Sequence, residues 1–329
     1  MHKEPSGLPG RSPRAWVNRW KWRIKRYSNI HIQAAKPNVF VFSTARSGST
    51  WLMEIIASER GIKFISEPLY LAQFREGGPL PSSWEFLLPH AQREPALENY
   101  FRQLLENRLG VGSPAPFSRF HRFVSRRIVV KDLRCHDLMN WFEERFQFQI
   151  VYLIRHPLPT ALSRKSYARL PLFLSNDIYC ERFLTPELRA YGWSILDRGT
   201  ELEKKVLDWC LQNLPPLKFL DRSRWLCLHY EDVVLEPAAT IDRLADFLGL
   251  VDKEKMRRQA NVASRSTSSS EPETQRFLAQ APSDHDRLYL INRWRSKVSR
   301  EEEGRAFEIL RRFEIDLYEP DEDLPANRL

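Results

Sequence analysis

The stretch Asn38–Arg60, NVFVFSTARSGSTWLMEIIASER, decides the fold that the sequence predicts. Its first six residues are mostly β-branched or aromatic, which indicates a buried strand over 38–43. From Thr50 onward, apolar residues recur at helical spacing. The turn between them, 44–49, consists of small residues and one arginine. Such a strand-turn-helix unit favours an anion, because the amides of the first helical turn and the helix dipole face the ligand.

The turn differs from the phosphate-binding loop of kinases and NTPases, GxxxxGK[ST], at two positions. Ser43 replaces the first glycine, and Ser49 stands where the lysine that contacts the β- and γ-phosphates is expected. The positive charge lies inside the loop instead, at Arg46. A loop of this kind suits one phosphate-like group at a 5′ position better than a triphosphate with Mg²⁺. An ordinary strand-turn-helix junction without a ligand is the alternative.

The segment 44–52, TARSGSTWL, resembles the 5′-phosphosulfate loop of sulfotransferases, which use 3′-phosphoadenosine-5′-phosphosulfate (PAPS). Trp51 matches the tryptophan that stacks on the adenine in many members, although a core position is the alternative for this side chain. The resemblance implies that the co-substrate is bound by Thr44, Ala45, Arg46, Ser47, Gly48, Ser49, Thr50 and Trp51.

Strands and helices alternate along the rest of the chain. This order predicts an α/β fold with a doubly wound, mostly parallel five-stranded sheet and flanking helices, similar to P-loop NTPases. Ligands of such sheets bind beyond the carboxyl ends of the strands. The expected strands are 38–43, 61–66, 127–133, 148–155 and 224–229, and the clearest helices are 97–109, 201–211, 237–248 and 300–312.

Two further motifs follow predicted strands, where the ligand of the loop would lie. YLIRHPLPTALSRKSYA carries Arg155 and, eight residues later, Ser163. In sulfotransferases an arginine and a serine at this spacing bind the 3′-phosphate, and a guanidinium with a hydroxyl is a suitable clamp for a phosphate. LHYED resembles the segment whose tyrosine, here Tyr230, contacts the adenine. The last cofactor loop of the family has only a weak counterpart near 291–295, which leaves contacts from Arg265 or Ser266 open.

Sulfuryl transfer requires a base for the acceptor's proton and cations for the charge of the leaving group. Glu67 lies in SEPL, which resembles the carboxylate segment of Golgi carbohydrate, tyrosylprotein and bacterial sulfotransferases, where this residue acts as the base. In Lys131-Asp132-Leu133 the leucine stands where cytosolic small-molecule members have a histidine, which favours Glu67 and the former branch. Lys131 and Arg46 would supply positive charge. A solvated strand-end acid is the alternative for Glu67, and the weaker candidates for the base are Asp132, His136 and His156.

The net charge of +9 is unevenly distributed. Residues 1–36 hold nine basic residues and one acid, whereas the rest holds 42 basic and 41 acidic residues. The body is therefore not a general polyanion binder, and no nucleic-acid partner is expected. The four cysteines form no CxxC pair, which favours free thiols and argues against a zinc site. Without a long apolar segment or a signal peptide, the sequence predicts a soluble, cytoplasmic protein without a metal.

We expect a basic arm over 1–36, followed by one domain over 37–329 with an acceptor-binding insertion at 69–125. The arm predicts an amphipathic helix with Val17, Trp20, Ile24 and Tyr27 on one face and basic residues on the others. Such a face can lie on a membrane, as a peripheral contact. Packing on its own domain or on a second copy in a homodimer is the alternative.

The resemblance implies transfer of a sulfonate from PAPS to a hydroxyl or amine, with release of 3′,5′-ADP and without a metal. A small molecule, a carbohydrate or a lipid is expected as the acceptor. Two alternatives remain, a P-loop-like kinase and a membrane-associated protein with a sulfotransferase-like body that no longer turns over.

Overall fold

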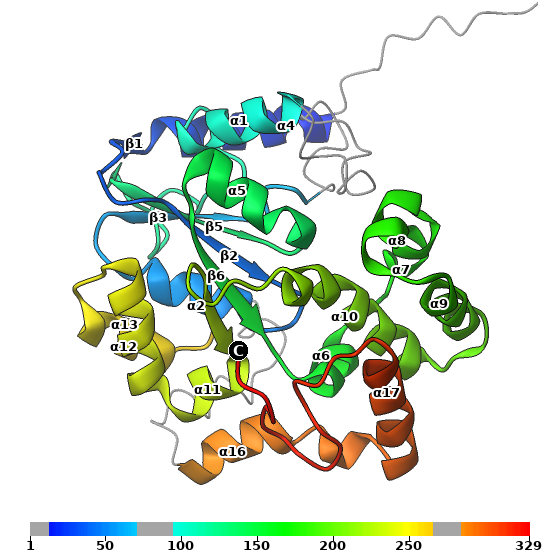
Figure 1. Cartoon of the computed structure of the whole chain (residues 1–329). Helices are drawn as coiled ribbons and strands as arrows, with labels where there is room; N and C mark the ends of the chain where they lie inside the picture. Colours follow the sequence, from blue (N-terminus) through cyan, green and yellow to red (C-terminus); the bar gives the residue numbers. More distant parts are fainter. Residues whose placement is uncertain (1–12, 71–94, 266–283) are drawn as a thin grey trace, which may run out of the picture.

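The structure, a computed structural model, describes residues 13–70, 95–265 and 284–329. Strand β2 is the middle strand of a five-stranded parallel sheet of order β3-β5-β2-β6-β7 (Figure 1). Its side chains alternate between two cores, with Phe40 and Phe42 on one face and Val39 and Val41 on the other. The predicted α/β fold with a five-stranded parallel sheet is confirmed. The strands are β2 (Val39–Ser43), β3 (Ile62–Ser66), β5 (Arg127–Asp132), β6 (Gln149–Ile154) and β7 (Leu226–His229).

Helices cover both faces of the sheet (Figure 1). Residues of α2, α11, α12 and α13 share the core with Val39 and Val41, whereas α4, α5, α10 and α17 share the core with Phe40 and Phe42. The helices are α1 (Pro13–Tyr27), α2 (Ser49–Ile56), α4 (Pro95–Leu105), α5 (Met139–Phe146), α6 (Pro157–Ser163), α7 (Leu170–Ser175), α8 (Asp177–Phe183), α9 (Pro186–Arg198), α10 (Glu201–Lys218), α11 (Tyr230–Leu235), α12 (Pro237–Leu248), α13 (Lys253–Ala260), α16 (Asp284–Asn292) and α17 (Arg300–Arg312), with short 3₁₀ turns η3 (His136–Leu138) and η4 (Arg295–Lys297).

The register of the sheet brings the predicted site segments to one edge. Ser66 is paired with Lys131, Ser43 with Leu153 and Ile154 with His229. Because all five strands are parallel, the segments that follow these residues leave the sheet on the same side. The turn 44–48, Glu67, Arg155 and Tyr230 therefore start from neighbouring strand ends.

Two helices differ in length from the prediction. Helix α4 ends at Leu105 instead of 109. Asn107 takes a left-handed φ of 57°, and its side-chain amide donates to the backbone carbonyl of Asn29 over 2.9 Å. Helix α10 continues through Pro215 and Pro216 to Lys218. Pro215 cannot donate to the carbonyl of Leu211, and the hydroxyl of Tyr179 donates there instead.

The end of the predicted arm is attached to the body. Strand β1 (Ile30–His31) pairs in parallel with β4 (Val124–Ser125), a sheet that the sequence did not indicate. Asn29 is buried and donates to the hydroxyl of Ser125 over 3.1 Å. The division at 36/37 remains a prediction. Residues 71–94 of the predicted insertion and most of a polar loop expected at 264–275 lie outside the described residues.

The cysteines and the helices bear on two further expectations. All four cysteines are buried free thiols, as their spacing indicates. Among the described residues, no helix has the length and apolar character needed to cross a membrane.

Candidate active site

The turn after β2 depends on a glycine. Gly48 has a φ of 86°, and a Cβ atom at this position would lie 2.5 Å from the ring of Tyr230. Only glycine therefore combines this backbone conformation with so close a ring. The hydroxyls of Thr44 and Ser47 are 2.8 Å apart, and this contact closes the turn from within. Helix α2 starts directly afterwards, so its first amides lie at the turn, as the sequence predicted.

The predicted nucleotide-binding side chains form a stack beside this turn. The guanidinium carbon of Arg155 lies 4.1 Å from the centroid of the Tyr230 ring, and its Nη1 donates to the carbonyl of Arg46 over 3.1 Å. Trp51 meets Tyr230 edge-on, with the ring centroids 5.9 Å apart. The structure thus brings Arg46, Trp51, Arg155 and Tyr230 together from three strand ends.

Two buried donors in this stack have no hydrogen-bond acceptor among the described residues. They are Nε of Arg155 and Nε1 of Trp51. Buried donors without a partner are costly, and an anionic or purine ligand is one way to satisfy them. Together with the glycine turn under the Tyr230 ring, they fit a nucleotide that carries phosphate groups. Ser163 is the last residue of α6 and lines the adjoining pocket with Ala45 and Arg46.

Arg265, an open candidate for a phosphate contact, is held by contacts within the protein. Its Nε donates to the buried carboxylate of Glu54 over 2.8 Å, and its guanidinium covers the ring of Phe64 at 4.6 Å. These contacts account for its orientation as a structural cation. Ser266 lies outside the described residues, so its predicted contact stays open.

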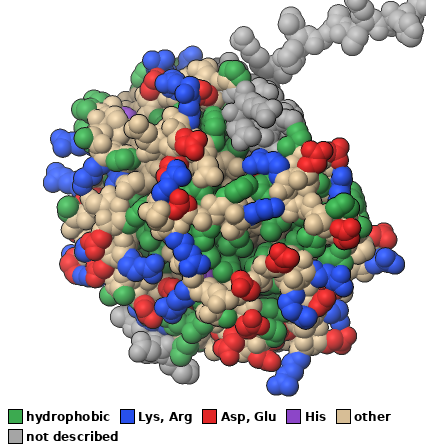
Figure 2. All heavy atoms as spheres, in the orientation of Figure 1, with side chains coloured by type: hydrophobic (Ala, Val, Ile, Leu, Met, Phe, Trp, Pro, Cys, Tyr) green, Lys and Arg blue, Asp and Glu red, His purple; other side chains and the backbone are tan. Residues whose placement is uncertain are grey.

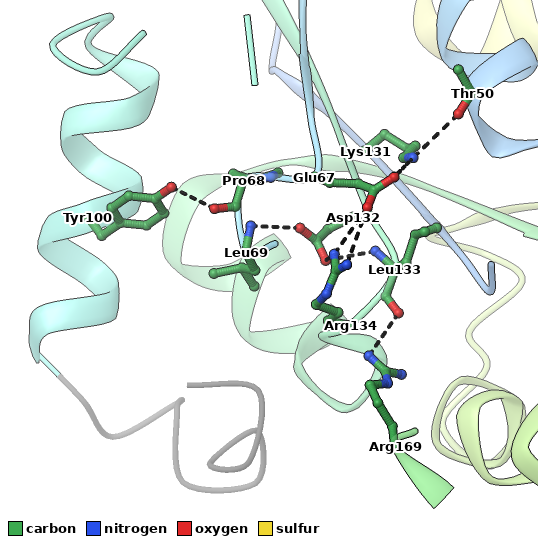
Figure 3. Close-up of polar contacts among 10 residues, drawn as sticks. All are labelled: Thr50, Glu67, Pro68, Leu69, Tyr100, Lys131, Asp132, Leu133, Arg134 and Arg169. Atoms are coloured by element: carbon green, nitrogen blue, oxygen red, sulfur yellow. Dashed lines mark hydrogen bonds and ion pairs between the residues drawn. The ribbon is translucent and has the colours of Figure 1, made fainter. Parts of the chain in front are cut away.

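Glu67 lies between two cations directly after β3 (Figure 3). One carboxylate oxygen is 2.6 Å from Nζ of Lys131, and the other accepts from both terminal nitrogens of Arg134 at 3.3 Å. The ammonium of Lys131 also lies 3.4 Å from the hydroxyl of Thr50 on α2. Glu67 has a left-handed φ of 51°, and its amide donates to the carbonyl of Lys131 over 2.6 Å. The turn after β3 therefore aims this carboxylate at the end of β5.

The pKa of Glu67 is lowered from its ordinary value. Burial raises this pKa, but the charges and hydrogen bonds of Lys131 and Arg134 together outweigh burial. The residue is a carboxylate at neutral pH, which is the protonation state that a proton acceptor needs.

The weaker candidates for the base, Asp132, His136 and His156, are all buried. The pKa of His136 and that of His156 are each lowered to about 3, chiefly by burial. His156 accepts from the amide of Leu158 at the start of α6 and stacks on Trp294 with the ring centroids 4.9 Å apart. Asp132 accepts from the amides of Leu69 and Leu133 over 2.9 and 2.7 Å, which fixes the chain after β3 and β5 (Figure 3).

A pocket of about 640 Å³ opens beside the turn and Glu67's partner Arg134. Its single acidic side chain among the described residues, Asp208, forms an ion pair with Arg164. From the predicted insertion 69–125, the described part of the lining contains Tyr70 alone. The basic side chains of the lining are Arg46, Arg134, Arg164, Lys165 and Arg169.

Most of these basic residues were missed by the sequence analysis. A signal was present, since Arg164 and Lys165 follow Ser163 directly in the quoted motif and Arg169 is the first residue after that motif. Arg169 donates to the carbonyl of Leu133 over 3.2 Å, so the two ends of the pocket are joined. The carboxyl ends of β5 and β6 thus share a positively charged wall.

Another carboxylate, which is fully buried, lies after β7. Glu231 accepts from the amide of His156 over 2.9 Å and from the hydroxyl of Tyr318 over 3.0 Å. Burial raises its pKa to about 7, although these hydrogen bonds and the charge of Arg155 act in the opposite direction. Its neighbours show that it ties the end of β7 to α6 and to the C-terminal segment.

Comparison with known proteins gives the family. Residues 36–301 match the family model of the sulfotransferase domain, so the chain belongs to the sulfotransferase family. A curated mouse protein, sulfotransferase 2A6, is 23% identical over 216 residues, which cover 64% of this chain. The match spans 59% of the length of that relative.

Solved structures of sulfotransferases are also similar to this chain. The sulfotransferase domain of the Synechococcus PCC 7002 olefin synthase has 18% identity and a TM-score of 0.41, with 87% of this chain and 98% of that domain covered. Mouse sulfotransferase SULT7A1, solved with PAP, has 18% identity and a TM-score of 0.43, with 86% of this chain and 85% of that protein covered.

Proposed function

We propose that the protein is an enzyme that transfers the sulfonate group of PAPS to a hydroxyl or amine of an acceptor and releases 3′,5′-ADP. Membership of the sulfotransferase family supports sulfuryl transfer as the reaction class. The stack of Arg155, Tyr230 and Trp51 beside the turn 44–48 supports a nucleotide donor. A triphosphate is disfavoured, because Ser49 stands where a phosphate-binding loop has lysine.

In this reaction a bond forms between the acceptor oxygen or nitrogen and the sulfur, while the bond from sulfur to the bridging phosphate oxygen breaks. The acceptor's proton passes to a carboxylate oxygen of Glu67, and the electron pair of the broken bond stays on 3′,5′-ADP. Lys131 and Arg46 supply positive charge to the oxygens on which negative charge develops. No metal is required for this balance of charge.

The observation that carries the proposal is the contact of Glu67 with Lys131. A proton acceptor and a cation for the leaving group have to lie within a few ångströms of each other around one sulfuryl group. The 2.6 Å contact, with the hydroxyl of Thr50 3.4 Å from Lys131 at the start of α2, supports these two roles for Glu67 and Lys131. Family members that use a carboxylate in this segment support the same role for Glu67.

The pocket lining favours an acceptor that already carries a negative charge. The described lining has five basic side chains and one acidic one, Asp208, which pairs with Arg164, while Arg134 pairs with Glu67. A phosphate, sulfate or carboxylate group on the acceptor would complement this wall. Tyr70 and Tyr167 add aromatic surface, which suits the ring of a sugar or a phenol.

The direct test is turnover of labelled PAPS against a panel of sugars, phenols, lipids and peptides, with matched neutral and anionic members. We expect transfer to one class and higher kcat/KM for its anionic member. Calorimetry with 3′,5′-ADP and with ATP accompanies the panel, and we expect binding of 3′,5′-ADP alone. ATP binding in preference to 3′,5′-ADP would support a kinase, and 3′,5′-ADP binding without turnover on any acceptor would support the non-catalytic alternative.

A further inference from the structure

Helix α1 presents its apolar stripe to solvent. Val17, Trp20, Ile24 and Tyr27 follow each other at intervals of three and four residues and are 41%, 46%, 53% and 73% exposed. In a helix that packs on its own domain, this stripe would be the buried side. This exposure argues against the alternative that the apolar face packs on its own domain.

Contacts at the C-terminal end of α1 fix the helix in this orientation. Asn29 is buried, donates to the carbonyl of Arg122 over 2.6 Å and accepts from the amide of Asn107. The ring of His121 contacts the carbonyl of Ser28 at 3.1 Å. Lys25 faces inward, and burial lowers its pKa, with nearby positive charges acting in the same direction. The helix is thus turned with a lysine toward the protein and its apolar side outward.

The exposed apolar surface continues past α1 onto the small sheet. Ile30 and its register partner Val124 are 63% and 48% exposed. Phe117 and Phe123 lie with their ring centroids 6.2 Å apart, and Phe117 is 88% exposed. We refer to the combined area as the α1–β4 surface, which consists of Val17, Trp20, Ile24, Tyr27, Ile30, Ile32, Phe117, Phe123 and Val124. Monomeric proteins rarely expose so many large apolar side chains in one region.

All the charged residues of α1 are basic. The helix sequence, PRAWVNRWKWRIKRY, contains six basic residues and no acid. The guanidinium of Arg23 lies 5.8 Å from the ring of Trp20, and that of Arg26 lies 5.1 Å from the ring of Tyr27. In the view of Figure 2, the upper edge, where Figure 1 shows α1, carries basic side chains next to hydrophobic ones, with a few acidic side chains among them. Apolar, aromatic and basic side chains in one surface are typical of proteins that lie on anionic bilayers.

We propose that the α1–β4 surface docks the protein on the face of a membrane that contains anionic lipids. The apolar side chains enter the boundary of headgroups and acyl chains, and the rings of Trp20 and Tyr27 lie at that boundary, where such rings are favoured. The basic residues of α1 contact lipid phosphates. A second copy of the chain is a poorer occupant, because symmetric pairing would bring two sets of α1 cations together.

The test is co-sedimentation of the full chain with vesicles of phosphatidylcholine alone and with vesicles in which about one third of the lipid is phosphatidylserine. We expect binding to the anionic vesicles that weakens with added salt and is much weaker with neutral vesicles. The double variant Trp20→Ala/Ile24→Ala should bind at least about tenfold more weakly, since two apolar side chains no longer enter the bilayer. Lys21→Glu/Arg23→Glu should lose most of the preference for anionic vesicles.

A matched control is Trp193→Ala, since Trp193 on α9 is 41% exposed but lies outside the α1–β4 surface. We expect its vesicle binding to equal that of the unchanged protein. Thermal unfolding and 3′,5′-ADP binding should be the same in all variants, which separates docking from folding and from the proposed reaction. The proposal is overturned if the unchanged protein does not bind anionic vesicles, or if Trp20→Ala/Ile24→Ala binds them normally. A dimer that Trp20→Ala/Ile24→Ala dissociates, without vesicle binding, would assign the surface to a second copy instead.

Discussion

The end of β3 holds a half-buried carboxylate and the end of β7 a buried one, and the pKa values of the two groups move in opposite directions. Glu67 has Lys131 and Arg134 as hydrogen-bonded partners, and its pKa is lowered. Glu231 has neutral donors, the amide of His156 and the hydroxyl of Tyr318, and its pKa is raised to about 7. Burial acts in the same direction on both, so the charge of the hydrogen-bonded partners decides the difference.

The comparison indicates how the two strand ends divide their roles. A carboxylate between cations is ionised at neutral pH and lies beside charges that a sulfuryl donor also needs. A carboxyl group that is protonated up to about pH 7 and hydrogen-bonded to α6 and the C-terminal segment holds the fold together. We therefore expect chemistry from the end of β3 and stability from the end of β7.

The largest expected effect is on turnover in Glu67→Gln. The amide keeps the shape of the side chain but cannot accept the acceptor's proton, so turnover should fall by roughly 10²–10⁴. Affinity for 3′,5′-ADP should stay within about twofold, measured by calorimetry. Glu231→Gln is the matched control and should keep near-normal turnover. A larger loss of turnover in the control than in Glu67→Gln would reverse the assignment of the two ends.

Arg46→Ala and Arg155→Ala test the binding of the nucleotide itself. Each should weaken 3′,5′-ADP binding by roughly 1.5–3 kcal/mol, the usual contribution of a hydrogen bond to a charged group. Ser163→Ala should weaken it less. The control is Arg189→Ala on α9, which removes a surface ion pair with Asp177 and should leave binding unchanged. Wild-type affinity in both arginine variants would show that the stack beside Tyr230 is not the nucleotide site.

Arg134→Gln tests the cause of the lowered pKa of Glu67. The base has to be ionised, so turnover of the unchanged protein should fall only below about pH 4.5, under the ordinary value of the carboxyl group. Removal of one cation raises the pKa of Glu67, and the acid limb of the pH–kcat profile should shift to higher pH. Activity at alkaline pH should change much less. An unshifted acid limb would mean that another group controls this part of the profile.

The smallest expected effect is on the pH dependence of stability at Glu231. Its pKa is about 7 in the folded protein and 4.5 ordinarily, so between these values the folded state binds more protons than the unfolded state. The contribution of this group is therefore most favourable below pH 4.5 and is lost as the pH rises through 7. Relative to Glu231→Gln, the Tm of the unchanged protein should decline between these pH values. Parallel Tm profiles for the two proteins would contradict the raised pKa.

Features that depend on neighbouring residues in the sequence were predictable. The apolar runs place the five strands of the sheet within one or two residues at each end. Gly249, with a φ of 63°, ends α12 where the sequence indicates. The turn 44–49 and the motif from Arg155 to Ser163 also gave the correct strand ends, because each combines a strand with a defined turn.

Features that depend on distant contacts were not predictable. The amphipathic pattern of α1 is the same whether its apolar side faces inward or outward, and its orientation depends on contacts with distant residues such as those of Asn29. Arg134 was not recognised as a second cation beside Lys131, because it lies 67 residues from Glu67 in the sequence. Asn107 ends α4 through contacts with Lys63 and Asn29, far away in the sequence.

Pro215 has no amide hydrogen, so the carbonyl of Leu211 accepts its hydrogen bond from the hydroxyl of Tyr179. This contact limits which substitutions positions 179 and 215 can tolerate. Phenylalanine at 179 would leave the carbonyl of Leu211 without a donor in a buried place, whereas a residue with an amide hydrogen at 215 would restore the helical hydrogen bond and compete with the tyrosine. Substitution of both residues, which lie 36 positions apart, should therefore be tolerated more readily than substitution of either one alone. In homologous chains, we expect loss of the proline to accompany loss of the tyrosine hydroxyl.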